Sequence, residues 1–192
     1  MACEVTRKHV LPSQCARCSV TNKIALKTLL VLSSVSQMPV LASIAVKSSS
    51  SKFCLPNECQ NCSWTGNRFH PEDIRICKLT GLTIHQEFLT EDRSYLRPLF
   101  DLLNDLQSSP DGKKYPLLEG AVSRKLKGLK CRIVSGAISP TKNTWAVCAV
   151  SKSVMGFKID HLGFVLSPQT KEIIGQIAQG KRTRNGWVGR ST

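Results

Sequence analysis

The feature that most constrains this chain of 192 residues is a short motif that recurs every fifteen residues. Each copy begins with Cys or Ser, continues with any residue, an apolar residue and Thr or Ser, and ends in Gly or a polar turn residue. Five copies are clear and one is degenerate; they begin at Cys3, Cys18, Ser33, Ser48, Cys62 and Cys77. A unit of this size is too small to bury a core alone, so the copies must stack.

Each copy is predicted to form a knuckle, a short strand and half a helical turn. Pro71 and the two acids that follow it suit the first turn of a helix. The period also explains the uncharged stretch 28–46 as two copies in which Ser replaces the leading Cys. This stretch is long enough to span a membrane. We expect it in the core of the repeats, with no membrane partner, and a membrane segment is the alternative.

The cysteines are concentrated in the same part of the chain as the repeats. Seven of the nine cysteines and three of the four histidines lie within residues 1–92. An odd cysteine count and two C-x-x-C spacings favour metal ligation in a reducing compartment over a disulfide framework. Because a C-x-x-C turn supplies two of the four ligands of zinc, we predict two structural zinc sites. The candidate ligands are Cys3, Cys15, Cys18, Cys54, Cys59, Cys62, His70, Cys77 and His85.

The ligands outnumber two sites, so their assignment stays open. The best-spaced set consists of Cys59, Cys62, His70 and Cys77, in which His85 could replace His70. The other set consists of Cys3, Cys15 and Cys18, completed by His9 or Cys54. The remaining cysteines, Cys131 and Cys148, are expected to be small buried apolar residues.

Charge divides the chain near residue 92. Residues 1–92 carry 10 basic and 7 acidic side chains, and residues 93–192 carry 17 and 6. We therefore predict a zinc-binding repeat region over 1–92 and a basic domain over 93–192. The net charge of +14 favours polyanionic partners such as nucleic acid.

The basic half is predicted to have an α+β fold. Apolar spacing predicts helices over residues 93–108 and 117–129. The period then changes to that of strands, over residues 132–139, 144–151, 156–166 and 172–178. The simplest arrangement is an antiparallel sheet of four strands with two helices on one face. In the chain, this domain follows the small Cys/His zinc-knuckle repeats at the N-terminus.

Two basic segments are candidates for nucleic-acid contact. Their cations could neutralise phosphates, and Trp187 could stack on a base. The residues are Arg124, Lys125, Lys127, Lys130, Lys181, Arg182, Arg184 and Trp187. The alternative is a solvated tail in which Trp187 packs under the sheet. Nothing in these segments indicates base specificity, so DNA and RNA are both open as targets.

Part of the chain resembles a known group of sequences. The copies Cys62-Ser-Trp-Thr-Gly and Cys77-Lys-Leu-Thr-Gly, with the later string Ile177-Ala-Gln-Gly-Lys-Arg-Thr, are similar to cysteine-rich zinc-knuckle regions in some bacterial proteins labelled as SWI/SNF-type helicases. The resemblance implies an accessory module that docks on nucleic acid or on a motor protein. It implies no ATPase activity, because the motor motifs are absent from this sequence.

The sequence favours a cytoplasmic, non-enzymatic zinc module that associates with nucleic acid. It contains neither a phosphate-binding G-x-x-x-x-G-K-[ST] loop nor a G-x-S-x-G or H-E-x-x-H motif. One alternative is a zinc-dependent adaptor that binds another protein. Another is a metal-dependent nuclease, in which Glu72 or Asp73 would act beside His70.

Overall fold

The computed structural model describes residues 1–104, 131–152 and 159–190. The chain forms two compact units. Unit 1 comprises Met1–Asn61 and Arg68–Ile74, and unit 2 comprises Cys62–Asn67 and Arg75–Thr192. The turns of the last two repeats therefore group with the C-terminal sheet. The boundary at residue 92, which followed composition, stays a prediction.

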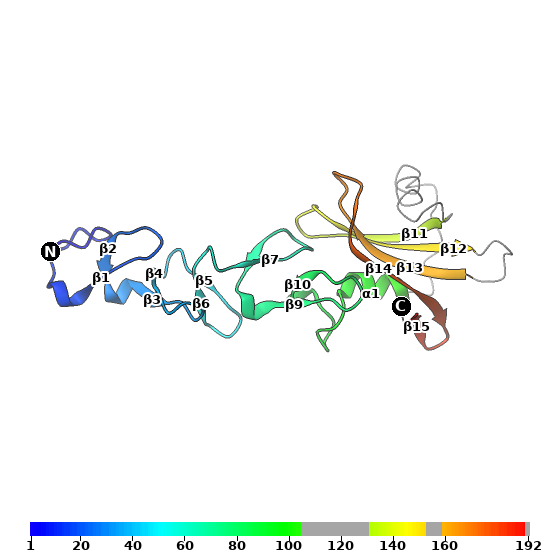
Figure 1. Ribbon diagram of the computed structural model, residues 1–192, viewed down its shortest axis with the longest axis horizontal. Helices are drawn as coiled ribbons and strands as arrows, with labels where there is room; N and C mark the ends of the chain where they lie inside the picture. Colours follow the sequence, from blue (N-terminus) through cyan, green and yellow to red (C-terminus); the bar gives the residue numbers. More distant parts are fainter. Residues whose placement is uncertain (105–130, 153–158, 191–192) are drawn as a thin grey trace. The chain divides into compact units, whose positions relative to one another are not determined.

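Unit 1 is an array of short antiparallel β-hairpins. The pairs follow one another in sequence order (Figure 1). They are β1 (Cys15–Arg17) with β2 (Ile24–Leu26), β3 (Leu30–Leu32) with β4 (Pro39–Leu41), β5 (Val46–Lys47) with β6 (Phe53–Cys54), and β7 (Gln60–Asn61) with β8 (Arg68–Phe69). Each pair flanks one copy of the repeat motif, so the motif is the turn of a hairpin.

Single turns of 3-10 helix connect successive hairpins. They are η1 (Pro12–Gln14), η2 (Lys27–Leu29), η3 (Pro71–Asp73) and η4 (Gln86–Phe88). The helical turn predicted at Pro71 is confirmed as η3, where Nδ1 of His70 accepts a hydrogen bond from the Glu72 backbone N–H at 3.1 Å. Tight 3-10 turns of this kind are common short connectors between elements.

The core of unit 1 is built from small and medium-sized side chains. Its buried members are Cys3, Cys18, Ala25, Val40, Leu41 and Leu55. Two of these belong to the uncharged stretch 28–46, whose residues supply β3 and β4. In the part of the chain that the structure describes, no helix has the length and apolarity needed to cross a membrane.

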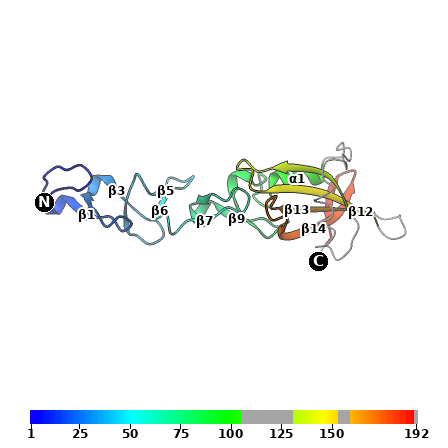
Figure 2. The ribbon, with the colours of Figure 1, turned by 90° about the horizontal axis from the view of Figure 1, so that it is seen from above.

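Unit 2 contains a five-stranded antiparallel meander. The strands are β11 (Cys131–Ile138), β12 (Trp145–Lys152), β13 (Ile159–Leu166), β14 (Ile173–Thr183) and β15 (Gly186–Gly189), and they lie in sequence order. Figure 2 shows β12, β13 and β14 from above. The unit also holds the helix α1 (Arg97–Asn104) and the strand β10 (Thr83–His85), which pairs with β9 (Ile74–Ile76), a strand that begins at the last residue of unit 1.

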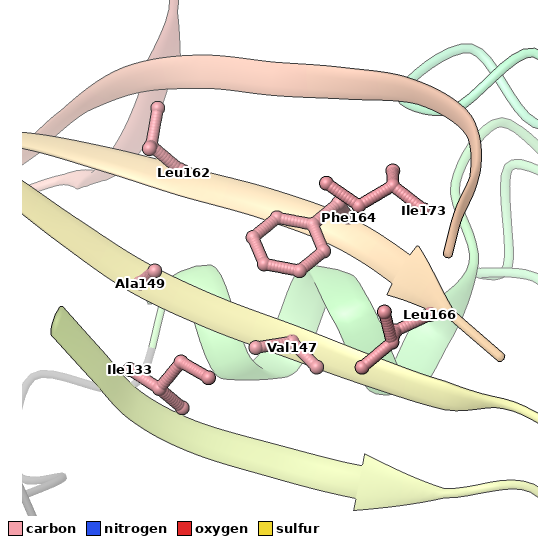
Figure 3. Packing of buried hydrophobic residues seen from close by; sticks show 7 residues of the cluster. All are labelled: Ile133, Val147, Ala149, Leu162, Phe164, Leu166 and Ile173. Atoms are coloured by element: carbon pink, nitrogen blue, oxygen red, sulfur yellow. The ribbon is translucent and has the colours of Figure 1, made fainter. Parts of the chain in front are cut away.

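Both faces of the meander carry apolar side chains. Seven buried residues gather on one face (Figure 3): Ile133, Val147, Ala149, Leu162, Phe164, Leu166 and Ile173. Because successive side chains of a strand point to opposite faces, Gly163 belongs to the other face. There α1 packs so closely that a Cβ on Gly163 would lie 2.8 Å from Cδ1 of Leu103.

The predicted α+β fold is wrong, because the chain is mostly strand. The first predicted helix is α1 in its described part, and the second, over 117–129, lies outside the described residues. The repeats raise the strand content because the residues on both sides of each repeat turn pair as short strands. The sheet also has a fifth strand: Gly186 and Gly189 allow the C-terminal segment to pair closely with β14.

Candidate functional site

The repeat motif folds into the same hairpin turn in five copies, and into a turn one residue shorter in the fourth. In the second copy, the Cys18 N–H donates to the Lys23 carbonyl and the Asn22 N–H donates to the Cys18 carbonyl, each at 2.9 Å. The residue near the end of each turn is left-handed, with φ between 60° and 76°. These residues are Arg7, Asn22, Gln37, Ser51, Gly66 and Gly81. Gly and Asn tolerate this conformation best, so the Gly or polar residue of the motif is explained by the backbone.

The buried side chain of the leading Cys or Ser accepts hydrogen bonds from backbone N–H groups and so acts as the cap of this turn. All six leading residues are at most 5% exposed. The Ser33 hydroxyl accepts hydrogen bonds from the backbone N–H groups of Val35 and Ser36, at 3.1 and 3.2 Å. The Cys62 thiol accepts one from the N–H of His85 in the next repeat, at 3.3 Å. Local caps of this type are a known use of Ser, and a sulfur can accept more weakly.

The same contacts change the acidity of two thiols. The Thr6 hydroxyl and neighbouring backbone N–H groups lower the pKa of Cys3 to about 7, although burial opposes this. Burial also acts to raise the pKa of Cys18. The Thr21 hydroxyl and three backbone N–H groups outweigh it and lower that pKa to about 7. Both sulfurs therefore behave as acceptors in their turns.

The predicted zinc ligands are distributed over separate turns. Of the best-spaced set, Cys59 and His70 belong to unit 1, and Cys62 and Cys77 belong to unit 2. Among the residues that the structure describes, no group of three or more Cys, His, Asp or Glu side chains is placed to hold a metal ion. The geometry gives the predicted sets no support, and zinc binding stays a prediction.

One pair of predicted ligands does come together. The sulfurs of Cys54 and Cys59 lie 3.5 Å apart. Burial and the adjacent Cys59 thiol raise the pKa of Cys54 to about 12. Neither cysteine leads a repeat. Of the remaining predicted ligands, Cys15 and His85 are half-buried.

The acidic side chains of unit 1 accept hydrogen bonds from other residues of the same unit. Glu4 accepts the Ile24 N–H at 3.0 Å. Glu58 accepts the Ser33 hydroxyl at 2.5 Å. Burial acts to raise its pKa, but the hydroxyls of Ser33 and Ser36 and the Leu55 N–H hold that pKa below the ordinary range.

The two carboxylates considered for a nuclease are also engaged. Glu72 forms an ion pair with Lys52 at 2.8 Å and accepts the Ser50 hydroxyl. Asp73 is buried and accepts both the N–H and the hydroxyl of Ser49, at 3.0 and 2.6 Å. Every acid of unit 1 therefore accepts hydrogen bonds from its own unit.

Most cations of unit 1 are free to meet a partner. Arg17 donates to Asn22, and Lys52 pairs with Glu72. The other six cations are exposed, and none forms an ion pair with another described residue. We call them the repeat cations: Arg7, Lys8, Lys23, Lys27, Lys47 and Arg68.

The predicted nucleic-acid residues fall into three groups. Lys181 and Arg184 are exposed on the β14–β15 hairpin. Arg182 instead donates through Nε to the Leu103 carbonyl at 2.5 Å, and so anchors the end of α1. The remaining four cations, Arg124, Lys125, Lys127 and Lys130, lie outside the described residues.

Trp187 packs along its own hairpin. A Cβ on Gly180 would lie 2.5 Å from Cε2 of Trp187, and one on Gly189 would lie 3.0 Å from Cη2. The backbone N–H of Trp187 donates to the Asn104 side-chain carbonyl at 2.8 Å. The indole therefore packs over Gly180 and Gly189 of the strand pair and is half-buried, and base stacking stays a prediction. The buried Cys148 also fits its predicted role, because burial raises the pKa of its thiol to about 11.

Sequence reasoning missed that two sheet loops form related turns, of which the Ser167 loop has the pattern of the usual repeat turn and the Ser139 loop is a variant of it. The Ser139 N–H donates to the Thr144 carbonyl and the Ser167 N–H donates to the Glu172 carbonyl, both at 2.9 Å. Lys142 and Lys171 are left-handed, with φ of 59° and 57°. The signal was a Ser followed by Thr and Lys between two apolar runs.

The first of these loops contacts a repeat turn. The Thr144 hydroxyl donates to the Trp64 carbonyl, and the Thr141 hydroxyl donates to the Thr65 carbonyl at 2.7 Å. Trp64 is buried to 1% exposure. These contacts join a repeat turn to the tip of a hairpin in the meander.

Comparisons of the chain with protein-family models, curated proteins and solved structures find no match.

Proposed function

We propose that this chain is a non-enzymatic module that binds nucleic acid through exposed cations. The observation that supports this most strongly is the use of charge in unit 1. Each of its four acids accepts hydrogen bonds from the unit itself, whereas the six repeat cations are exposed. Polyanion binding draws on such unpaired cations, because each phosphate contact releases condensed counterions.

Two of the repeat cations occupy equivalent positions in neighbouring turns. Lys8 and Lys23 occupy the same position, the last residue of the turn, in consecutive copies. Neighbouring copies are joined by backbone hydrogen bonds, as from the Glu4 N–H to the Ile24 carbonyl at 2.9 Å. Two cations at equivalent positions of joined turns suit contact with phosphates of one strand. The target is then recognised by charge and shape, and base specificity is not part of the proposal.

The β14–β15 hairpin offers a second group of cations. Lys181 and Arg184 extend into solvent there, while Arg182 and Trp187 hold the hairpin to α1 and to itself. An accessory role to a helicase-type motor is the setting that the sequence resemblance implies, and the cysteine usage favours the cytoplasm. Zinc is not required by this mode of binding.

The test is binding of the full chain to labelled duplex DNA, single-stranded DNA and RNA over a series of salt concentrations. Affinity is expected to fall steeply with salt, and each lost phosphate contact is expected to reduce the salt slope by about one. The double variant Lys8→Glu/Lys23→Glu should bind at least tenfold more weakly. Lys181→Glu/Arg184→Glu should also weaken binding.

The matched control is Lys142→Glu/Lys171→Glu, which changes the net charge equally at two exposed loop residues outside both groups. This control should retain most of the affinity. Equal losses in all three double variants would show that only net charge matters. Absence of binding to all three nucleic acids at low salt would contradict the proposal.

A further inference from the structure

The last two repeats show how a repeat turn is covered by another part of a protein. We define the turn edge as the third and fourth residues of each copy. In the fifth copy these are Trp64 and Thr65, whose carbonyls accept the hydroxyls of Thr144 and Thr141. Both edge residues are buried, at 1% and 2% exposure.

The sixth copy is covered by a different segment of the same sheet. The Gln176 N–H donates to the Thr80 carbonyl at 2.7 Å, and Thr80 has no exposed surface. At this contact Gly175 has a φ of +72°, and a Cβ there would lie 2.4 Å from the Thr80 carbonyl oxygen. Two turn edges thus receive N–H or hydroxyl donors from an antiparallel sheet.

The turn edges of the first three copies are open. Their apolar residues, Val5, Val20 and Val35, are 44%, 44% and 54% exposed. A single exposed valine needs no explanation. These three, however, occupy one position in consecutive copies that are hydrogen-bonded to one another, through the pairs Glu4 to Ile24 and Ser19 to Pro39. We call these three exposed valines, which occupy equivalent positions in successive turns, the valine row.

We propose that the valine row binds β-hairpin tips of a protein partner. The mode of binding is the one seen at Trp64 and Thr65: hydroxyl or N–H groups of the tip donate to the carbonyls of a turn edge, and apolar atoms cover its side chain. The edge carbonyls of residues 5, 6, 20 and 21 accept no backbone hydrogen bond from another described residue. A tip that brings donors can therefore bind without displacing existing contacts.

Charge defines the partner further. Arg7, Lys8 and Lys23 are exposed on the same turns as Val5 and Val20, and Glu4 is already bonded to Ile24. A tip flanked by acidic residues is favoured at such a surface. A second copy of this chain is disfavoured, because its net charge is +14 and its own tip at Thr141 and Thr144 is already bound.

The test uses a hairpin peptide that the chain itself defines. A backbone-cyclised peptide that carries residues 138–145 in its tip, with glutamates on both sides of the tip, is titrated into the isotope-labelled full chain, and amide chemical shifts are followed. Perturbation is expected at residues 5, 6, 20, 21, 35 and 36. A peptide with Thr141→Val and Thr144→Val lacks the hydroxyl donors and should leave these amides unmoved.

Variants of the chain separate the valine row from apolar surface in general. Val20→Asp should weaken the peptide at least tenfold, and Val35→Asp should do the same. The matched control is Leu32→Asp, because Leu32 is 60% exposed in the same unit but lies in β3, outside the turn edge. Urea unfolding of each variant checks that it is folded.

Three results would overturn the proposal. One is absence of the expected shifts at millimolar peptide, and another is an equal loss of affinity in Leu32→Asp. The third is duplex DNA that perturbs the same amides and loses affinity in Val20→Asp, because the row would then belong to the nucleic-acid surface. If Val20→Asp and Val35→Asp weaken the peptide but retain DNA binding, the valine row serves the protein partner, and only the flanking cations are shared with nucleic acid. Failure of DNA binding alone leaves the peptide result unaffected.

Discussion

The role of the leading cysteines can be decided by comparing two substitutions at Cys62. This residue is fully buried, and its sulfur accepts the His85 N–H at 3.3 Å. If Cys62 caps its turn, Cys62→Ser retains an acceptor, as Ser33 and Ser48 do at the same position of other copies. We expect that variant to lose less than about 1 kcal/mol in the free energy of unfolding, typical of one altered hydrogen bond.

Cys62→Ala removes the acceptor entirely. It leaves the His85 N–H without this acceptor. An unsatisfied buried donor costs about 1–3 kcal/mol, so Cys62→Ala should be clearly less stable than Cys62→Ser. A zinc ligand behaves differently: Ser and Ala both remove the thiolate that zinc requires, and both should cause a similar, larger loss together with loss of metal.

The assay is urea unfolding followed by tryptophan fluorescence, for which the buried Trp64 in the same turn is a natural reporter. Elemental analysis of the reduced wild-type chain and of both variants supplies the metal content. Near-native stability of Cys62→Ser, with Cys62→Ala well below it, supports the turn cap. Equal destabilisation, with zinc present in the wild type and lost from both variants, would refute our reasoning.

Two other predictions concern backbone fit and pH. Gly175→Ala should destabilise unit 2 by about 1–3 kcal/mol, because it forces a left-handed alanine against a backbone carbonyl; the control Gly136→Ala, whose Cβ would lie 3.4 Å from its nearest neighbour, should cost less in the same urea assay. The pKa of Glu58 is lower in the folded than in the unfolded chain, so its stabilising contribution is complete above the ordinary Glu pKa and is lost as pH falls through the folded value. Ser33→Ala should move that pKa upward in an NMR titration and flatten this acid dependence, and an unchanged pKa would contradict the role of the Ser33 hydroxyl.

The period of the repeats could be predicted from the sequence, but the chemistry of its cysteines could not. A Cys that begins a hairpin turn and a Cys that ligates zinc in a knuckle are both followed by similar turn residues. The sequence alone therefore does not distinguish the two roles. Ser33 and Ser48 were the informative copies, because Ser rarely replaces a structural zinc ligand but readily replaces a hydrogen-bond acceptor. Whether Cys54 and Cys59 approach each other depends on how one hairpin packs on the next, which spacing alone does not give.

The strands of the meander were predictable where apolar residues recur regularly. The predicted strand 144–151 corresponds closely to β12 (Trp145–Lys152), and 172–178 corresponds to the first part of β14. The fifth strand was missed because the basic residues of the tail and Trp187 were interpreted as a nucleic-acid-binding segment. In the folded chain, the Trp187 backbone N–H donates to the Asn104 side chain, and Arg182 donates to a carbonyl group at the end of α1. Such long-range contacts carry no local sequence signal.

The fourth copy of the motif has implications for how this chain can vary. Its turn is one residue shorter than the others, so that the Ser48 N–H donates to the Lys52 carbonyl at 2.8 Å, yet the fifth copy follows with its usual turn. A length change at a tip is thus absorbed within one hairpin. By the same logic, unequal recombination between copies could add or remove a whole fifteen-residue unit without disturbing its neighbours. The number of open turn edges, and with it the valency of the binding surface, could then change in single steps during evolution or by design.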